Sequence, residues 1–514
     1  MKVLVFSGYA NYTHYGADLE LIQRHLDEGD EVLNLHCAGD IPTCDFNPCH
    51  GAIECRTCIR TRQRGLSLVS PNVASAPFLN LTPANRRELE SLPESYGTLE
   101  SLRTASVENF DFGWAVLSSV VSLIRDPEPD LRLHGNLARR FAWAALATYR
   151  SIQNHLDREK TDCVYVFNGR LAIYRAVLRA CQSRGVACYT HDRGCDIHHY
   201  ATFRDAMPHD LQLVRAEMRQ AWDRAAGDPA RFDVAEKFFV ERMNGMPQDW
   251  LSFVGTQEAG MLPASWEGSR KNIVIFNSSE DEFAAIGDEW KNPLYPSQLD
   301  GIRRIIESLT TERQGLKLYL RMHPNLKGIG NQQTTALYDL ERDYFEVIRP
   351  ESAVSTYALL QQCDQTVTFG STVGIEAVYQ GKPSILAGPS FYRDLGCTYN
   401  PSSHEELVQM IRSDLQPKDK TPALMYGYFM RTFGIPYRHV SAAGFLDSRF
   451  KGQSLATKMP FADAWLLRVQ RLQKALKDEP VSNWPTLFQA RFNAWMRKRA
   501  AAGHNAHAEY ISPG

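Results

Sequence analysis

The chain has 514 residues, of which 44% are hydrophobic and 23% charged, and its formal net charge is −2. This length exceeds what one hydrophobic core normally organises, so we expect two domains of ordinary size. The near-neutral charge gives no global attraction to nucleic acid, and we expect no such partner. No apolar run reaches the length of a membrane span.

The N-terminus turns polar after Phe6 and lacks the apolar region and cleavage site of a signal peptide. It is predicted instead to be the first strand of the fold. A cytoplasmic protein follows from this interpretation, and its eleven cysteines are then expected to be reduced or metal-bound.

The first half of the chain alternates between strand and helix patterns, as parallel sheets covered by helices do. The predicted elements are a strand at 2–7, a helix at 17–28, a strand at 31–36, a buried helix at 112–124, an amphipathic helix at 137–158, a strand at 163–170, a helix at 171–184 and a strand at 186–194.

The stretch 243–271 has no clear period and is predicted to be a linker. The alternation then restarts, with strands at 272–283, 316–324, 344–350, 365–371 and 383–388 and helices at 296–313, 355–362 and 372–380. We therefore predict domains at 1–255 and 270–430, followed by a helical extension over 431–514.

Polar and small residues gather where three strands of the second domain end. The sequence LKLYLRMHPNL stops its strand at His323-Pro324, because proline cannot donate to a sheet ladder. In TFGSTVGIEA, Gly370 precedes Ser371 and Thr372, either of which can cap the following helix and present N–H groups to a phosphate. The alternative is an ordinary strand-to-helix turn.

Glu376 lies one helical turn beyond Thr372 and can accept hydrogen bonds from ribose hydroxyls. The third strand end, FNSSEDEF, offers Ser278, Ser279 and Glu282 as donor contacts. Its acidic residues could bind a donor sugar, or could simply form the acidic first turn of a helix.

His-Pro at one strand end, followed by Gly-Ser-Thr-Val-Gly-Ile-Glu-Ala and Gly-Lys-Pro, resembles a group of bacterial surface-polysaccharide glycosyltransferases. The group includes capsule Kdo transferases, polysialyltransferases and CDP-glycerol polymerases. The resemblance covers roughly residues 270–390. It implies an α/β fold of the GT-B type, in which two Rossmann-like domains face a central cleft and C-terminal helices follow.

The resemblance also implies the roles of particular residues. His323, Pro324, Ser371, Thr372 and Glu376 match the motifs that hold the nucleotide of a cytidine-activated donor. His323 would meet the donor phosphate, which places it among the catalytic residues as well. The implied function is transfer of a sugar from a nucleotide-sugar donor, CMP-linked as for Kdo or sialate, to a glycan or lipid-linked acceptor.

The first domain supplies candidates for the acceptor side. Asn168 and Arg170 could fix a sugar or a carboxylate, together with Arg193. His191 and Asp192 are the candidates for the base, and Asp192 is our choice for an inverting reaction. Arg193 would lower the pKa of its neighbour, so the alternative is an ion pair that shapes the loop.

Two parts of the sequence contain residues of metal-ligand type. Cys37, Cys44, Cys55 and Cys58 include the C-x-x-C half-site of structural zinc, although free buried thiols explain the pattern about as well. The histidine pair at 198–199 lacks carboxylates at regular spacing, so no metal role is expected for it. No Asp-x-Asp motif stands at a donor position, which favours metal-independent transfer.

Residues 486–500 place an aromatic face beside arginine and lysine side chains. Such a helix can lie on the anionic inner-membrane surface, making the protein peripheral to the membrane, or it can pack on the protein body.

Three other functions stay open on the sequence: a UDP-sugar-dependent GT-B transferase, a nucleotide-sugar epimerase, and a scaffold or regulatory protein that retains a nucleotide cleft. A transferase should need an acceptor for turnover, whereas an epimerase should convert the nucleotide sugar without any acceptor. A scaffold should turn over no donor at all.

Overall fold

The computed structural model describes residues 1–10, 12–246, 257–312, 315–444, 447–463, 465, 466 and 469. The chain divides into two compact units, Met1–Ala456 and Thr457–Gly514. The amphipathic segment predicted at 486–500 lies outside the described residues. Within the described residues, no helix combines the length and the apolar character needed to cross a membrane.

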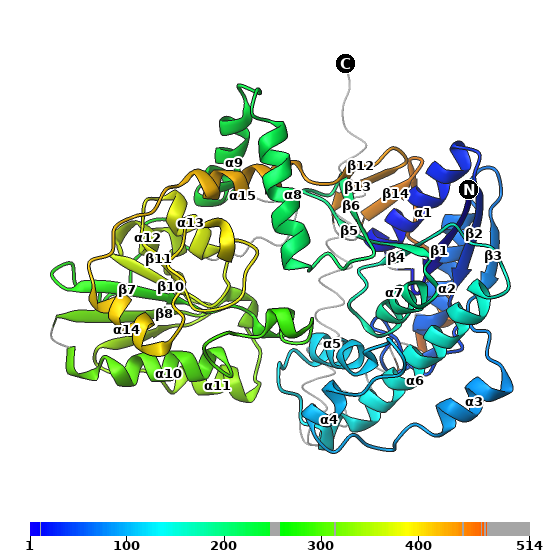
Figure 1. Ribbon diagram of the computed structural model, residues 1–514, viewed down its shortest axis with the longest axis horizontal. Helices are drawn as coiled ribbons and strands as arrows, with labels where there is room; N and C mark the ends of the chain where they lie inside the picture. Colours follow the sequence, from blue (N-terminus) through cyan, green and yellow to red (C-terminus); the bar gives the residue numbers. More distant parts are fainter. Residues whose placement is uncertain are drawn as a thin grey trace, which may run out of the picture. The chain divides into compact units, whose positions relative to one another are not determined.

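Two separate sheets organise the first unit (Figure 1). The first sheet has seven strands in the order β12-β6-β5-β4-β1-β2-β3. Its strands β1 to β5 are parallel, whereas β6 runs antiparallel to β5. The strands are β1 Lys2–Ser7, β2 Glu31–His36, β3 Ala74–Pro77, β4 Cys163–Phe167, β5 Ala187–Arg193, β6 His199–Arg204 and β12 Ile435–Pro436.

Helices cover both faces of this sheet, which explains why β1 is buried along almost its whole length. Leu4 and Phe6 pack in one cluster with α5, α6 and α7, and Val3 and Val5 pack on α1 across the other face. The helices of this half are α1 Tyr12–Asp27, α2 Ala52–Leu66, α3 Pro83–Glu90, α4 Leu99–Arg103, α5 Phe112–Ile124, α6 Leu131–Leu156, α7 Ala172–Arg184, α8 Leu211–Arg224 and α9 Arg231–Met243.

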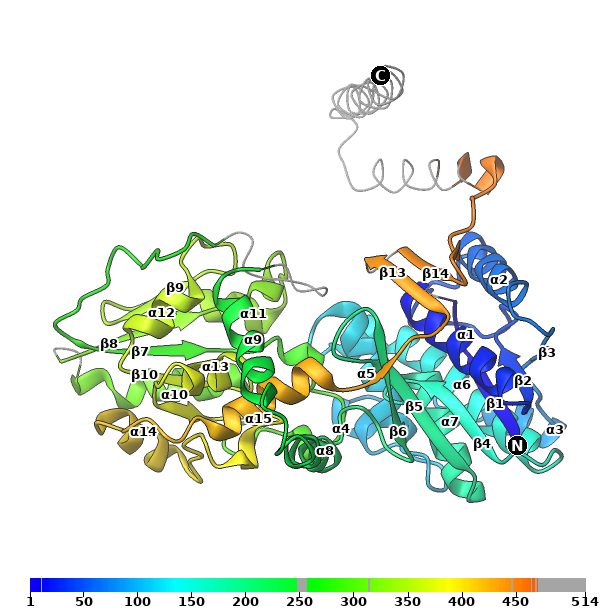
Figure 2. The ribbon, with the colours of Figure 1, turned by 90° about the horizontal axis from the view of Figure 1, so that it is seen from above.

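The second sheet has five parallel strands in the order β11-β10-β7-β8-β9 (Figure 2). Ile273 and Ile275 of β7 join the cluster formed with α10, and Val274 and Phe276 join the cluster with α12 on the opposite face. The strands are β7 Lys271–Phe276, β8 Leu316–Arg321, β9 Phe345–Ile348, β10 Gln365–Thr368 and β11 Ser384–Leu386. The helices are α10 Gln298–Ser308, α11 Gln332–Tyr338, α12 Thr356–Gln362, α13 Val373–Tyr379, α14 His404–Arg412 and α15 Thr421–Thr432.

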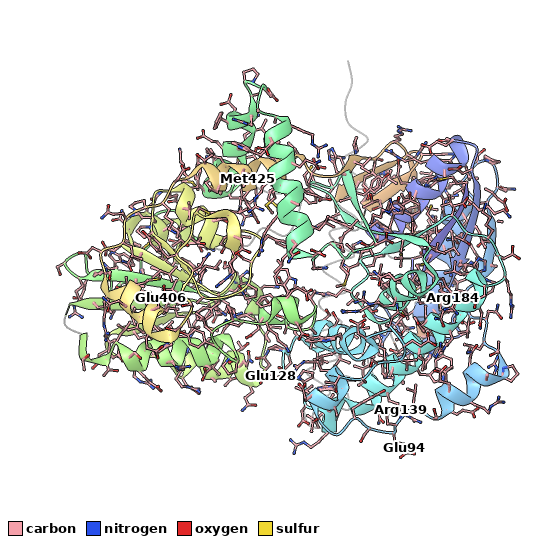
Figure 3. The ribbon with its side chains drawn as sticks, in the orientation of Figure 1. Glu94, Glu128, Arg139, Arg184, Glu406 and Met425 are labelled. Atoms are coloured by element: carbon pink, nitrogen blue, oxygen red, sulfur yellow. The ribbon has the colours of Figure 1, made fainter. Side chains whose placement is uncertain are left out.

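Helices α8, α9 and α15 share one apolar cluster with α13, and Met425 of α15, labelled in Figure 3, packs against it. After α15 the chain returns to the first sheet through β12, which pairs with β6. The next strands, β13 Val440–Gly444, β14 Asp447–Phe450 and β15 Gln453–Ser454, form a small antiparallel sheet.

The strands from 435 to 454 differ from the helical extension predicted to begin at residue 431. Helix α15 ends at Thr432 because Gly434 adopts a φ of +105°, and its missing Cβ allows a close approach to the Tyr200 carbonyl. Pro436 then fits a short strand at the edge of the sheet, where proline is tolerated. The α/β class with parallel sheets, by contrast, is confirmed.

Candidate active site

A cavity of about 800 Å³ opens between the strand ends of the two sheets. Loops that follow parallel strands line it, in the position where open α/β sheets bind ligands. Nine of the residues predicted for the site line this cavity. They are His191, Asp192 and Arg193 from the first half, and Glu282, His323, Pro324, Ser371, Thr372 and Glu376 from the second.

His323 sits two residues beyond β8, where Asn277 of the neighbouring strand end fixes its backbone N–H at 3.0 Å. The N–H of Asn325 donates to His323 Nδ1 at 3.2 Å, so the proton of the neutral ring is carried by Nε2. Burial lowers the pKa of His323 to about 4, although Asp281 opposes this. The side chain is therefore a neutral hydrogen-bond donor at pH 7.

Arg321, the last residue of β8, is a second donor at this wall of the cavity. It is 2% exposed, and its guanidinium donates to the carbonyls of Arg349 and Ser352, while Nε has no partner. Among the described residues it forms no ion pair with a carboxylate. Burial lowers its pKa to about 10, which still leaves it charged at neutral pH. A buried cation of this kind favours an anionic ligand nearby.

The turn after β10 is shaped by Gly370, whose φ is +99° and where a Cβ would come within 2.5 Å of the Pro389 carbonyl. Ser371 accepts a hydrogen bond from the Val373 N–H at 3.3 Å, and Thr372 makes no capping bond. Helix α13 has seven residues, so its dipole is small. The hydroxyls of Ser371 and Thr372, rather than the N-terminus of the helix, are therefore the polar groups at this part of the site.

Glu376 is nearly buried, with a side chain 3% exposed, and both of its oxygens are engaged. Arg242 of α9 donates to Oε1 at 3.0 and 3.1 Å, and the Tyr357 hydroxyl donates to Oε2 at 2.8 Å. A carboxylate has about four acceptor positions, so capacity for a ligand hydroxyl is left.

The remaining residues predicted at the second strand ends support the cavity from behind and do not line it. Ser278 donates to the Phe369 carbonyl at 3.1 Å, and Ser279 donates to Asp281 at 2.6 Å. Arg125, at the end of α5, pairs with Asp281 and so connects the two halves. Neither Ser278 nor Ser279 lines the cavity, and their predicted contact with the donor stays a prediction.

The first half presents Asp192 at the end of β5. Asn168 donates to one carboxylate oxygen at 2.6 Å, and the Arg193 N–H donates to the other at 2.8 Å. Burial works to raise the pKa of Asp192, but His14, His209 and Arg193 outweigh it and hold the pKa below its usual value. Asp192 is thus an ionised carboxylate at neutral pH.

Asn168 and Arg170 do not line the cavity and position its walls. Asn168 adopts a φ of +56° and holds Asp192 as described. Arg170 donates to the Glu282 carbonyl and to Ser122 at 2.9 Å, so it joins the two halves. Their predicted contacts with the acceptor stay a prediction.

Behind Asp192, His191 is fully buried and donates from Nε2 to Asp18 at 2.8 Å. Its Nδ1 has no partner among the described residues. His14 lines the cavity as well, with its ring 3.9 Å from the Phe167 ring, and burial lowers its pKa to about 4. Sequence reasoning missed His14, although the polar run after the first strand, SGYANYTHYG, is a strand end like the others.

The cysteine-rich stretch does not gather its thiols as one tetrahedral ion requires. Each of the four sulfurs accepts an N–H hydrogen bond, but no three of them lie within 4.8 Å of one another. Bonds of about 2.3 Å to zinc need a closer set, so the predicted zinc site does not fit the four residues as positioned. The sulfurs in question are those of Cys37, Cys44, Cys55 and Cys58.

Three half-buried histidines at or near the cavity give the fold a pH dependence. The pKa values of His14 and His323 fall to about 4, and that of His209 falls to about 3. Between pH 6.5 and 4 the unfolded chain binds protons that the folded chain does not, so the free energy of unfolding falls as pH falls. Each group contributes at most about 1.4 kcal/mol per pH unit.

We expect His209→Gln to flatten that loss, measured from urea unfolding midpoints at pH 7.5, 6.0 and 5.0. His134→Gln, on α6 away from the cavity, serves as the matched control. An equal slope in the wild type and in both variants would contradict the assignment of His209 as a histidine of lowered pKa.

Comparison with protein families gives a match to one segment of the chain. Residues 290–426 match the family model described as capsule polysaccharide biosynthesis protein. No curated protein sequence gives a match.

Solved structures give distant matches. The β-Kdo 2,4 transferase of KpsC from Thermosulfurimonas dismutans is 14% identical, with 58% of this chain and 84% of that chain covered at a TM-score of 0.36. The UDP-GlcNAc 2-epimerase from Neisseria meningitidis is 11% identical, with 84% and 94% covered at a TM-score of 0.24. The glycosyltransferase VinC is 14% identical, with 83% and 95% covered at a TM-score of 0.23. At these scores the matches say nothing about donor or acceptor.

The chain has two α/β sheets that share a cavity at their strand ends, and strands β8 to β11 of the second sheet lie within the segment that matches the family model. The segment it shares with capsule polysaccharide biosynthesis proteins, 290–426, contains His323, Ser371 and Glu376. This agrees with the resemblance first noted in the motifs around those residues.

Proposed function

We propose that the protein transfers a sugar from a CMP-linked donor, of the Kdo or sialate type, to a hydroxyl of a glycan or lipid-linked acceptor in surface-polysaccharide synthesis. The observation that carries this proposal is one cavity with two unlike walls. Neutral and cationic donors, His323 and Arg321, line one wall, and the ionised carboxylate of Asp192 lines the other.

The donor wall suits a nucleotide phosphate. His323 offers its Nε2–H, the hydroxyls of Ser371 and Thr372 line the same cavity, and the buried guanidinium of Arg321 adds a positive charge to its lining. Glu376, held by Arg242 and Tyr357, keeps acceptor positions for the ribose hydroxyls. Arg193 on the facing wall is the cation available to the carboxylate that Kdo and sialate carry on their anomeric carbon.

In the reaction, the acceptor oxygen bonds to the anomeric carbon as the bond between that carbon and the phosphate oxygen breaks. The acceptor proton passes to Asp192, and CMP leaves with the negative charge on its phosphate. Donors that are already in place, His323 above all, stabilise that charge in the transition state. Asp192 is a weak base because its pKa is low, so positioning of the acceptor hydroxyl contributes much of the rate.

The test of the donor assignment is nucleotide binding by calorimetry with CMP, CDP, UDP, GDP and ADP. We expect CMP or CDP to bind more tightly than the others. His323→Ala should weaken this binding about 10- to 100-fold, because a hydrogen bond to a charged group contributes about 1.5–3 kcal/mol. His134→Ala, outside the cavity, should leave the affinity unchanged.

Preference for UDP would agree with a sugar transferase and would exclude a cytidine-linked donor. Equal binding of CMP to the wild type and His323→Ala would remove His323 from the phosphate site. Conversion of a nucleotide sugar without acceptor would indicate an epimerase, and absence of turnover with every donor would indicate a scaffold.

A further inference from the structure

The hairpin that joins β5 to β6 carries three side chains of metal-ligand chemistry at its tip. Cys195 Sγ, a carboxylate oxygen of Asp196 and a ring nitrogen of His199 all lie within 4.8 Å of one another. All three residues also line the cavity. None of them has a part in the donor or acceptor contacts described above.

The backbone holds this tip in one conformation. The Gly194 N–H donates to the His199 carbonyl at 2.8 Å, and a Cβ at Gly194 would come within 2.5 Å of the His199 Cβ. The crossing segment after α15 fixes the tip from outside, because the Cys195 N–H donates to the Phe433 carbonyl at 3.0 Å. The three side chains therefore come from one short, closed turn that the segment after α15 restrains from outside.

The ligand atoms match zinc and its neighbours among the divalent metals. Thiolate, imidazole and carboxylate together are typical of zinc, and three protein ligands leave a fourth position for water or substrate. Bonds of about 2.0–2.3 Å in a tetrahedron place ligand atoms roughly 3.3–3.8 Å apart. The separations of up to 4.8 Å here must therefore shorten by about an ångström, and the 2.6 Å between His199 Nδ1 and Asp196 Oδ1 must lengthen by somewhat less.

The charges around the tip permit a cation. Arg431, whose charge acts on Cys195, is ion-paired with Glu241 at 2.9 Å, which offsets that charge. His199 Nδ1 now shares a hydrogen with Asp196 Oδ1 at 2.6 Å. A metal ion bound at Nδ1 would displace that hydrogen to Nε2 of the same ring, so the imidazole neither gains nor loses a proton, and the thiol of Cys195 releases one proton to solvent.

We propose that Cys195, Asp196 and His199 form a site for one zinc-class divalent cation, with its fourth coordination position open to the cavity. The sequence predicted no metal role for the histidines at 198–199 because carboxylates at regular spacing are missing; the folded turn nevertheless brings an Asp196 oxygen within 4.8 Å of a His199 ring nitrogen. The ion would fix the hairpin three residues beyond Asp192, and it is not needed for the transfer step proposed above.

Cobalt titration of the full chain, after removal of metal by a chelator, tests the site. Co²⁺ bound to a thiolate in a tetrahedral site gives a near-ultraviolet charge-transfer band and strong visible bands. We expect Cys195→Ser to bind one equivalent fewer than the wild type and to lose the corresponding charge-transfer intensity. Asp196→Asn and His199→Gln should each weaken that equivalent at least 10-fold.

Two controls make the result specific. Cys49→Ser removes an exposed thiol of the cysteine-rich stretch, and His198→Ala removes the neighbouring imidazole. Both should retain the full stoichiometry, and counting the difference in equivalents separates this site from any metal held by the other cysteines.

Equal stoichiometry and band intensity in wild type, Cys195→Ser and His199→Gln would overturn the proposal, as would a wild-type chain that binds no Co²⁺ at about 10 µM. Release of about one proton per ion at this site, followed in weakly buffered solution, should accompany binding in the wild type and in both control variants but not in Cys195→Ser. Nucleotide binding by the chelator-treated protein is measured alongside, so that failure of the metal site is distinguishable from failure of the proposed transfer.

Discussion

Asp192→Asn should lower kcat for sugar transfer about 100- to 10,000-fold, the range that a positioned proton acceptor contributes. The substitution keeps the shape of the side chain, and one oxygen can still accept from Asn168 or the Arg193 N–H. Folding and the affinity for the nucleotide should therefore survive. The measurement is kcat and KM with a saturating donor, beside a calorimetric nucleotide affinity for the same preparation.

Two further variants decide which group takes the proton. Glu289→Gln removes an exposed carboxylate outside the cavity and should have wild-type kcat. His191→Gln should have a smaller effect than Asp192→Asn, because His191 is fully buried behind it and bonded to Asp18. A large loss in His191→Gln with an active Asp192→Asn would transfer the role of base to the His191–Asp18 pair.

Sugar transfer also depends on how the two halves of the protein are held together at the cavity. Arg125 pairs with Asp281, Arg170 donates to the Glu282 carbonyl, and Arg175 donates to the Ile286 carbonyl at 2.7 Å. All three arginines belong to the first half and reach the loop after β7. That loop therefore borders both walls of the cavity. This explains why its polar groups form hydrogen bonds and ion pairs within the protein.

The hydrophobic pattern predicted most of the fold. The strand expected at 2–7 is β1, and the helix expected at 112–124 is α5, because in both cases burial on every side gives a continuous apolar run bounded by polar residues. The strands after α15 were not predicted. Their segment is short, half-exposed and stabilised by pairing with β6 and α1, which are distant in sequence.

The cavity, too, could be predicted only in part from local sequence. The positions of His323 and Ser371 at strand ends follow from sequence, since a proline or glycine marks where each strand stops. The partners that set their chemistry do not: Asn277 fixes His323 from another strand, and Arg242 reaches Glu376 across 134 positions of sequence. The ligand set at residues 195–199 depends on a tight turn, and spacing alone does not show such a turn.

Arg242→Met should lower the free energy of unfolding by about 3–5 kcal/mol, because it leaves the carboxylate of Glu376 buried without its charge partner. Glu376 is 3% exposed, and Tyr357 alone would then donate to it. Methionine keeps much of the arginine's length, so lost packing against Phe238 is a small part of the effect. Urea unfolding monitored by tryptophan fluorescence measures the change.

The matched control is Arg431→Met, which breaks the more exposed pair with Glu241 and should cost at most about 1 kcal/mol. The double variant Arg242→Met with Glu376→Gln should recover most of the lost stability, because no uncompensated charge is left behind. A loss in Arg242→Met no larger than in Arg431→Met would show that the pair is not effectively buried.

The double variant also separates the two roles of Glu376. If Glu376 only stabilises the fold, the rescued protein should bind CMP as the wild type does. If it binds the ribose, the rescued protein should fold normally and still bind CMP about 10-fold more weakly, since a charge-assisted hydrogen bond becomes a neutral one. The second outcome is expected, because Glu376 lines the cavity and keeps acceptor positions that neither Arg242 nor Tyr357 occupies.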